Sequence, residues 1–269
     1  TKAQSRCIQE INEDISSPQP MLRLLQGDVG SGKTIVSVFA LLQAVSNNFQ
    51  TAVMAPTEIL ARQHLQSFSN YLNHLGIKVA FLSGSQNTAE RTTQVNLIKS
   101  GEAQVVIGTH ALFQENVSFH NLALVIIDEQ HKFGVHQRLS LAQKASKTPH
   151  QLVMTATPIP RSLTMSAYAD LDISVIDELP PGRQKIKTVA LSNNRRDELI
   201  AKIKKISNEG RQIYWVCTLI EESEALRAES AENTFNYLSS NLEGIRVVMI
   251  HGRLTKSEKE GIMNDFTEG

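Results

Sequence analysis

Short apolar runs alternate with longer amphipathic stretches along the first two thirds of the chain. The runs have the length of buried strands and lie at 21–25, 51–55, 77–82, 104–107, 122–127, 152–157 and 173–176. Between them, apolar residues recur every three or four positions, as they do on one face of a helix. This alternation predicts an α/β fold with a mostly parallel sheet and helices on both of its faces.

Three of the expected helices show a clear apolar face. The faces consist of Ile8, Ile11 and Ile15, of Ile35, Val38, Phe39 and Leu42, and of Leu65, Phe68, Tyr71, Leu72 and Leu75. Thr57 follows a proline and can cap the third helix, and Gly76 can end it. In the sequence, the first of these helices precedes the run at 21–25 and the second follows it.

A proline-rich break, LPPGR at 179–183, interrupts the alternation. Two prolines exclude a central strand, and the glycine permits a turn. Beyond it the pattern restarts, with strands expected at 186–191, 212–219 and 245–250 and helices at 195–207, 221–238 and from about 255. We therefore predict two α/β domains, at 1–179 and 188–269, joined by a linker at 180–187.

The loop at 27–34 fits the phosphate-binding pattern G-x-x-x-x-G-K-[ST]. A strand precedes it and a helix follows, which is the order that the pattern requires. Glycines let backbone N–H groups converge on an anion at the positive end of that helix. Lys33 can reach the β- and γ-phosphates, and the Thr34 hydroxyl can bind Mg²⁺. The predicted nucleotide-binding residues are Gly27, Asp28, Val29, Gly30, Ser31, Gly32, Lys33 and Thr34.

A pair of carboxylates, Asp128 and Glu129, ends the apolar run at 122–127. The run is continuous and therefore typical of a strand buried on both faces, and the carboxyl ends of such strands hold ligands in α/β proteins. A buried Asp128 needs a partner, and Mg²⁺ would supply one. Glu129 would then face the γ-phosphate and could orient or deprotonate the attacking water.

Charge and cysteine content narrow the classes of function. Lys plus Arg and Asp plus Glu both number 27, so the formal net charge is zero, which argues against a generally basic nucleic-acid binder but not against a local basic groove. Cys7 and Cys217 have no metal-ligand spacing, and Cys217 in an apolar run is expected to be a small core residue. The sequence shows no long apolar span or signal peptide, so we expect a cytoplasmic location.

With these stretches in place, the chain resembles superfamily 2 helicases, and specifically the RecG family of branched-DNA helicases. The phosphate loop resembles motif I, and the segments at 55–58, 108–110, 128–131 and 155–157 resemble motifs Ia, Ib, II (in its DEQH form) and III. Longer strings are also RecG-like, namely those at 125–135, 155–161, 167–183 and 214–224, with a similar triplet at 251–253.

The resemblance implies a role for each matching residue. ATP and Mg²⁺ would be held by Lys33, Thr34 and Asp128, with Glu129 as the catalytic base. Gln4 would contact adenine, although a solvated helix glutamine is the alternative interpretation. His131 and motif III would couple hydrolysis to DNA movement, and Thr57 and Thr109 would touch the DNA backbone.

The resemblance also implies branched DNA as the partner, at forks and Holliday junctions, and a monomeric motor close to the nucleoid. RecG-like chains continue into motifs V and VI, whose arginines complete the ATP site, and carry an N-terminal wedge domain. The resemblance therefore implies that this chain is a segment of the motor, with two RecA-like domains of which the second is incomplete. Three alternatives stay open: a nucleotide-binding module without turnover, a transcription-repair coupling translocase and an RNA helicase.

Overall fold

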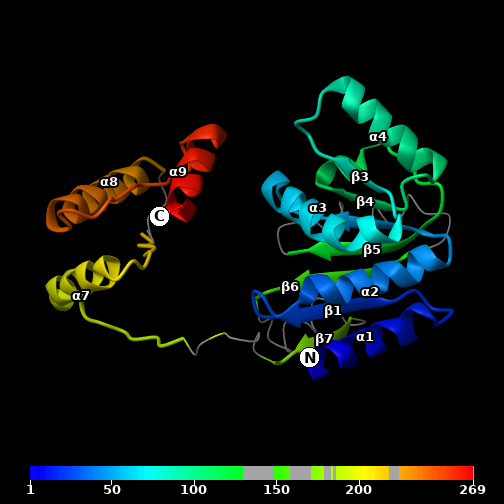
Figure 1. Cartoon of the computed structure of the whole chain (residues 1–269), viewed down its shortest axis with the longest axis horizontal. Helices are drawn as coiled ribbons and strands as arrows, with labels where there is room; N and C mark the ends of the chain where they lie inside the picture. The colour runs from blue at the N-terminus through cyan, green and yellow to red at the C-terminus, as the bar shows by residue number, and fades with distance from the viewer. Residues whose placement is uncertain are drawn as a thin grey trace. The chain divides into compact units, whose positions relative to one another are not determined.

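The computed structural model describes residues 1–114, 116–129, 148–157, 171–178, 183, 186–217 and 224–268. The chain divides into two compact units, Thr1–Gln184 and Lys185–Gly269 (Figure 1). The domain limits expected from the sequence remain a prediction. Among the described residues, no helix combines the length and the apolar character needed to cross a membrane.

The first unit is built on one parallel sheet of seven strands, in the order β3-β4-β2-β5-β6-β1-β7. The strands are β1 (Leu22–Gly27), β2 (Gln50–Met54), β3 (Val79–Leu82), β4 (Val105–Gly108), β5 (Leu122–Asp128), β6 (His150–Thr155) and β7 (Asp172–Ile176). All seven lie where apolar runs predict strands. The expected α/β class with a parallel sheet is confirmed.

Helices cover both faces of this sheet. They are α1 (Lys2–Ile15), α2 (Lys33–Ser46), α3 (Glu58–Leu72) and α4 (Thr88–Ser100), with short 3₁₀ helices η1 (Asn73–Leu75) and η2 (His110–Phe113). The first three pack into one hydrophobic cluster, while α4 and η2 contribute to a second. Strand β5 serves both clusters, because Ile126 lies in the first and Val125 in the second.

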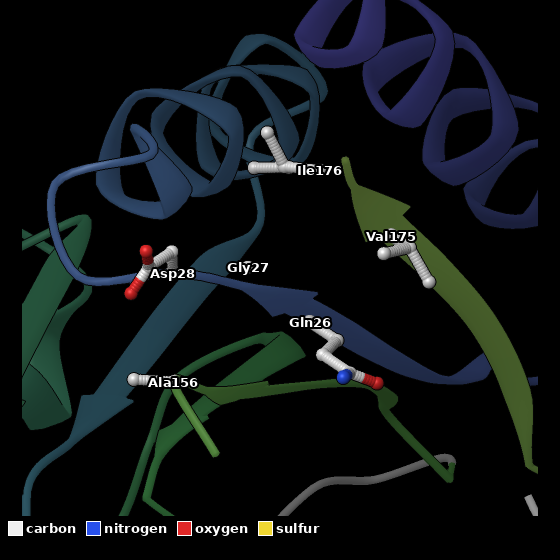
Figure 2. A pocket seen from close by; sticks show the side chains of 6 residues that line it. All are labelled: Gln26, Gly27, Asp28, Ala156, Val175 and Ile176. Carbon is white, nitrogen blue, oxygen red and sulfur yellow. The ribbon is translucent and has the colours of Figure 1, made fainter. Parts of the chain in front are cut away.

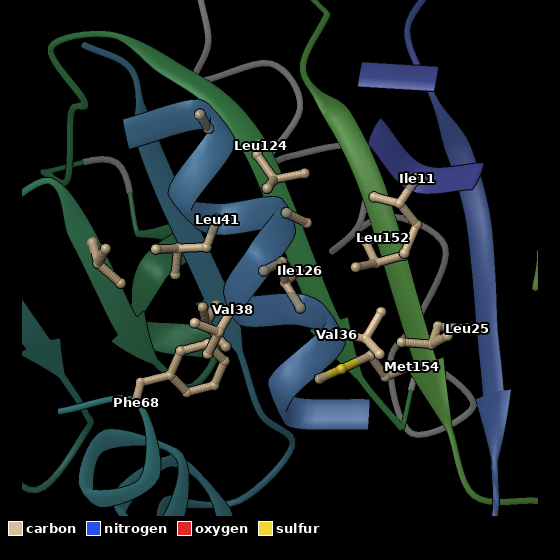
Figure 3. Close-up of a cluster of buried hydrophobic side chains, with 14 of the residues drawn as sticks. Ile11, Leu25, Val36, Val38, Leu41, Phe68, Leu124, Ile126, Leu152 and Met154 are labelled. Carbon is tan, nitrogen blue, oxygen red and sulfur yellow. The ribbon is translucent and has the colours of Figure 1, made fainter. Parts of the chain in front are cut away.

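The larger cluster lies beneath α2, as Figure 3 shows. Val36, Val38 and Leu41 of that helix pack over Ile126 of β5, and Phe68 enters from α3 with no exposed surface. Ile11 from α1 and Leu25, Leu152 and Met154 from the sheet complete the cluster (Figure 3). The core thus fixes α1, α2 and α3 against the strands whose ends carry the predicted site.

Two of the three predicted apolar faces need correction. Phe39, Tyr71 and Leu75 are 46%, 46% and 58% exposed, so they are not core residues. The buried face of α2 is formed by Val36, Ser37, Val38, Ala40, Leu41, Ala44 and Val45, and Phe39 points away from it. The 3₁₀ helix η1 turns with three residues per turn, so α-helical spacing no longer applies at Leu75. The predicted start is confirmed, because the Thr57 side chain caps α3, but α3 ends at Leu72 and Gly76, with φ +70°, ends η1 instead.

The second unit contains α7 (Arg196–Asn208), α8 (Glu224–Asn241), α9 (Lys256–Glu268) and the short η4 (Asn193–Arg195). These match the three helices predicted after residue 188. A small cluster joins α7 to α8 and the residue that follows it, and it consists of Ile200, Ile203, Leu238 and Leu242.

The strands predicted in this unit are not present among its described residues. Positions 186–191, 212–217 and 245–250 are outside regular structure, and 218–219 lie outside the described residues. An apolar run becomes a strand only where a neighbouring strand accepts and donates its backbone hydrogen bonds. Cys217 is exposed, so its prediction as a core residue is wrong, whereas Cys7 is buried.

Candidate nucleotide site

The phosphate-binding loop joins β1 to α2, as its pattern predicts. Strand β1 ends at Gly27 and α2 begins at Lys33. Gly32 stands at the N-cap with φ +91°, and a Cβ atom there would lie 2.2 Å from the Gln4 side-chain nitrogen. The left-handed backbone conformation favours glycine at this position, and any larger residue would also displace the Gln4 side chain.

Lys33 is folded back onto its own loop. Its Nζ donates to the carbonyl oxygens of Gly27, at 2.8 Å, and Asp28, at 3.1 Å. Burial lowers the pKa of the Lys33 ammonium, and the carboxylates of Asp128, Glu129 and Asp28 oppose that effect. Asp128 and Glu129 are therefore close enough to Lys33 to interact with it electrostatically.

Gln4 contacts the loop directly. Its Nε2 donates to the carbonyl oxygen of Ser31 at 2.8 Å, while its Oε1 accepts from the amino group of Thr1 within the capping box of α1. Ser31 is 3% exposed and its hydroxyl has no hydrogen-bond partner among the described residues. The structure thus joins Gln4 to the nucleotide loop, and its contact with adenine stays a prediction.

Asp128 lies at the end of β5, two strands from β1, with β6 between them. Its Oδ2 is 2.8 Å from Nε2 of His64 on α3, and both side chains are 13% exposed. The sequence argument gave a buried Asp128 a metal as its partner. The structure supplies a protein partner instead, so burial alone does not require the metal.

Glu129 adopts an unusual backbone conformation, with φ +50°. Its N–H still donates to the carbonyl oxygen of Met154 at 2.9 Å, which continues the pairing of β5 with β6. Its carboxylate accepts from the backbone N–H of Ala156 at 3.2 Å and from the Thr155 hydroxyl at 3.4 Å. A left-handed non-glycine residue is strained, and such strain is concentrated at functional sites.

A pocket of about 340 Å³ opens beside the loop, at the carboxyl ends of β1 and β7 (Figure 2). The residues that line it are Gln26, Gly27, Asp28, Ala156, Val175 and Ile176. Near this pocket, Arg183 pairs with Asp28 at 2.9 Å and donates to the carbonyl oxygen of Val29 at 2.6 Å. Arg183, in the LPPGR segment, therefore contacts the phosphate loop through an ion pair and a hydrogen bond.

The predicted DNA-contacting residues have different surroundings. Thr57 Oγ1 accepts from the N–H of Leu60 and is committed to capping α3. Thr109 is 3% exposed, and its hydroxyl has no hydrogen-bond partner among the described residues. His131 lies outside the described residues.

The side chains present fit a magnesium ion bound with nucleotide. Thr34 supplies a hydroxyl at the start of α2 and Asp128 a carboxylate near Lys33. In the described part of the chain, no three histidine, cysteine, aspartate or glutamate side chains cluster as a metal site would. Mg²⁺ in nucleotide sites takes only one or two protein oxygens and completes its shell with phosphate and water.

Comparison with known proteins agrees with this geometry. The family described as DEAD/DEAH box helicase matches residues 1–166. The chain belongs to this helicase family. It is 53% identical over its whole length to the ATP-dependent DNA helicase RecG of Escherichia coli O157:H7, and spans 39% of that protein. The predicted resemblance to RecG is thus confirmed.

Two solved structures place the fold among helicases. RecG bound to a three-way DNA junction is 41% identical and aligns over 100% of this chain and 35% of its own, with a TM-score of 0.80. Yeast Dbp5 L327V bound to RNA and ADP BeF3 aligns over 98% of this chain and 67% of its own, at 18% identity and a TM-score of 0.66. The second likeness shows the helicase fold alone.

Sequence reasoning missed three contacts of this helicase segment. His64 lies outside the recognised motifs, and its contact with Asp128 depends on how α3 packs. Arg183 belongs to a segment predicted as linker, yet it contacts the phosphate loop. The support of Glu129 by Ala156 could have been anticipated only from the adjacency of β5 and β6.

Proposed function

We propose that this chain is part of the motor of a RecG-type DNA helicase, in which ATP hydrolysis drives movement on forks and Holliday junctions. The single observation that carries the proposal is the meeting of motifs at the ends of neighbouring strands. The phosphate loop follows β1, Thr155 ends β6 and Asp128 ends β5, and these three strands are adjacent. The likeness to RecG along the whole chain supports the same function.

The proposed roles follow from the contacts. The loop from Gly27 to Thr34 would bind the phosphates, and Lys33 would exchange its two carbonyl partners for β- and γ-phosphate oxygens. Thr34 and Asp128 would hold Mg²⁺, which neutralises phosphate charge when bound. Gln4 would contact adenine from its position beside the loop.

Glu129 would act on the attacking water. Its carboxylate accepts the proton of that water as oxygen bonds to the γ-phosphorus, and the bond from phosphorus to the bridging oxygen of ADP breaks. The N–H of Ala156 and the Thr155 hydroxyl hold the carboxylate in place. His131 and the segment at 155–157 would pass the change at the γ-phosphate on to the DNA.

DNA would contact the unit near Thr57 and Thr109 through its phosphates, without base recognition. This contact is carried over from the resemblance to RecG, because the Thr109 side chain is only 3% exposed in the structure. We further propose that 188–269 belong to a second RecA-like domain after a linker at 180–187, that the motor acts as a monomer and that it works in the cytoplasm. The three helices α7, α8 and α9 and the full-length alignment with RecG support the second domain.

Titration with a fluorescent ADP analogue and Mg²⁺ tests the nucleotide site. We expect saturable binding by the parent chain and at least about a tenfold loss in Lys33→Ala, because the lysine supplies the point charge for the phosphates. The matched control is Lys99→Ala, an exposed residue in the last turn of α4. Equal binding by the parent and Lys33→Ala would refute the site.

Measuring ATP hydrolysis distinguishes a DNA motor from a nucleotide-binding module without turnover. We expect forked DNA to stimulate multiple-turnover ATP hydrolysis in a chain that includes the remainder of the protein, and Glu129→Gln to abolish it. Nucleotide binding without any turnover would favour the binding module instead. Stronger competition by RNA than by forked DNA would favour an RNA helicase, and indifference to branching would favour a translocase of the transcription-repair coupling type.

A further inference from the structure

A histidine outside all the recognised motifs contacts the predicted metal ligand. His64 lies on α3, near the middle of a helix whose N-cap is Thr57. Its Nε2 is 2.8 Å from Oδ2 of Asp128, and both side chains are 13% exposed. The two residues are 64 positions apart in sequence, so only the packing of α3 on the sheet brings them together.

The chemistry of the pair fixes the direction of the hydrogen bond. An ionised carboxylate only accepts hydrogen bonds, so the Nε2 atom of His64 carries a hydrogen and donates it. The imidazole also packs edge-on against Phe68, with ring centroids 5.9 Å apart at 65°, and Phe68 is fully buried. The donor is therefore held in place by the hydrophobic core.

A fixed donor on one carboxylate oxygen restricts the rotation of the carboxylate. The terminal torsion of aspartate is otherwise broad, and its two oxygens can exchange positions. With Oδ2 bound to His64, the second oxygen, Oδ1, has one preferred direction. A carboxylate that binds a metal directly or through water gains affinity from such an outer partner.

We propose that His64 is a positioning residue that holds Asp128 in the orientation needed for the Mg²⁺ ion bound with nucleotide. The inference rests on the proposed function, because it requires Asp128 to serve the nucleotide-bound metal. His64 does not touch the nucleotide or the metal; it acts through the carboxylate. Loss of such an outer partner lowers metal affinity about 10- to 100-fold in known metal sites.

Two substitutions at one position separate orientation from packing. His64→Leu keeps an apolar side chain against Phe68 and removes the donor. His64→Gln carries an amide nitrogen that can take the place of Nε2 and donate to Asp128. The matched control is His74→Leu, since His74 is an exposed histidine in η1 directly after the same helix.

The readout is the Mg²⁺ dependence of binding of a fluorescent ADP analogue to the chain, measured beside the melting temperature. We expect His64→Leu to raise the half-saturating Mg²⁺ concentration about 10- to 100-fold, with binding in the absence of Mg²⁺ unchanged. We expect His64→Gln to recover most of this loss and His74→Leu to behave like the parent. A purely structural role would lower the melting temperature of His64→Leu and leave its Mg²⁺ dependence unchanged, which would overturn the proposal.

The remaining outcomes also decide. If His64→Leu does not fold, His64→Gln and His64→Asn are compared, because the shorter asparagine cannot reach Asp128 and the proposal requires it to lose Mg²⁺ affinity. If the parent binds nucleotide through Lys33 without any effect of Mg²⁺, the role of His64 is overturned while the nucleotide site stands. If the parent binds no nucleotide at all, the proposed function fails and this inference fails with it.

Discussion

Single residues of this chain owe their properties to the neighbours that the fold gives them. His150, the first residue of β6, accepts the N–H of Met21 at its Nδ1, with 3.0 Å between the nitrogens. An acceptor nitrogen carries no hydrogen, so this ring is held in its neutral form. Burial lowers the pKa of His150 below its ordinary value, and Asp14 only partly opposes this.

The lowered pKa of His150 makes stability dependent on pH. Above about pH 6.5 the ring is neutral in both the folded and the unfolded chain, so it contributes no pH dependence. Below that value the unfolded chain takes up the proton first, and the free energy of unfolding therefore decreases until the pH reaches the folded pKa. Urea denaturation of the parent and of His150→Gln between about pH 8 and pH 5 measures this effect.

In His150→Gln the side-chain oxygen can still accept from Met21, but the side chain does not titrate. We expect the parent to lose more stability than His150→Gln between pH 7 and pH 5, because other titrating groups are common to both. Identical pH profiles of the two proteins would show that burial of His150 does not depress its pKa.

At the scale of elements, a buried arginine joins α1, β1 and β7. The Arg23 side chain is 11% exposed and bonds to Asp14 at 2.6 Å, with Glu10 at 3.7 Å and Asp172 at 3.9 Å. Its Nη1 also donates to the Ser174 hydroxyl at 3.0 Å. The edge of the sheet that carries the phosphate loop is thus held to the helix that carries Gln4.

Arg23→Met should destabilise the first unit by about 2 kcal/mol, since removal of one partner leaves carboxylates half-buried without their cation. The full 3–5 kcal/mol typical of a buried pair is not expected, because Asp14 and Glu10 keep some contact with water. Lys78→Met is the control, as that lysine is 62% exposed and pairs with Glu102 at the surface. If urea denaturation showed that both variants lose the same free energy of unfolding, this role for Arg23 would be contradicted.

At the scale of the whole molecule, the two units differ in what holds them together. Among the described residues, the first contains all seven strands and two hydrophobic clusters, whereas the second has one small cluster of four buried residues. Domains with their own core fold independently, and small units with few buried residues are marginal. The proposed nucleotide-binding loop and the carboxylates of Asp128 and Glu129 belong to the first unit.

A polypeptide of residues 1–184 should therefore unfold cooperatively and bind the fluorescent ADP analogue within about threefold of the whole chain, since the loop and its described contacts lie inside it. Residues 185–269 alone should show no cooperative transition. Calorimetry of the two polypeptides and of the whole chain provides the measurement. Loss of folding in 1–184 would mean that the second unit completes the core of the first.

The helices and strands of the first unit could be predicted because the spacing of apolar residues along the chain differs between helices and buried strands. Apolar runs at 21–25 and 122–127 became β1 and β5, and Thr57 caps the start of α3 as predicted. The predictions from apolar spacing were wrong where contacts with another helix or strand decide the structure. Exposed Phe39 lies outside the buried face of α2, and 186–191 has no described neighbouring strand to bond.

The α/β class, the phosphate-binding pattern, the acidic pair and the helicase family could all be predicted from the sequence, because each depends on residues adjacent in the chain. Which distant groups contact these residues depends on how the chain folds. His64 reaches Asp128, Gln4 reaches Ser31, and Arg183 reaches Asp28. The physical reason is that a hydrogen bond or ion pair depends on a separation of about 3 Å, and distances between distant segments are set by the packing of whole helices on the sheet.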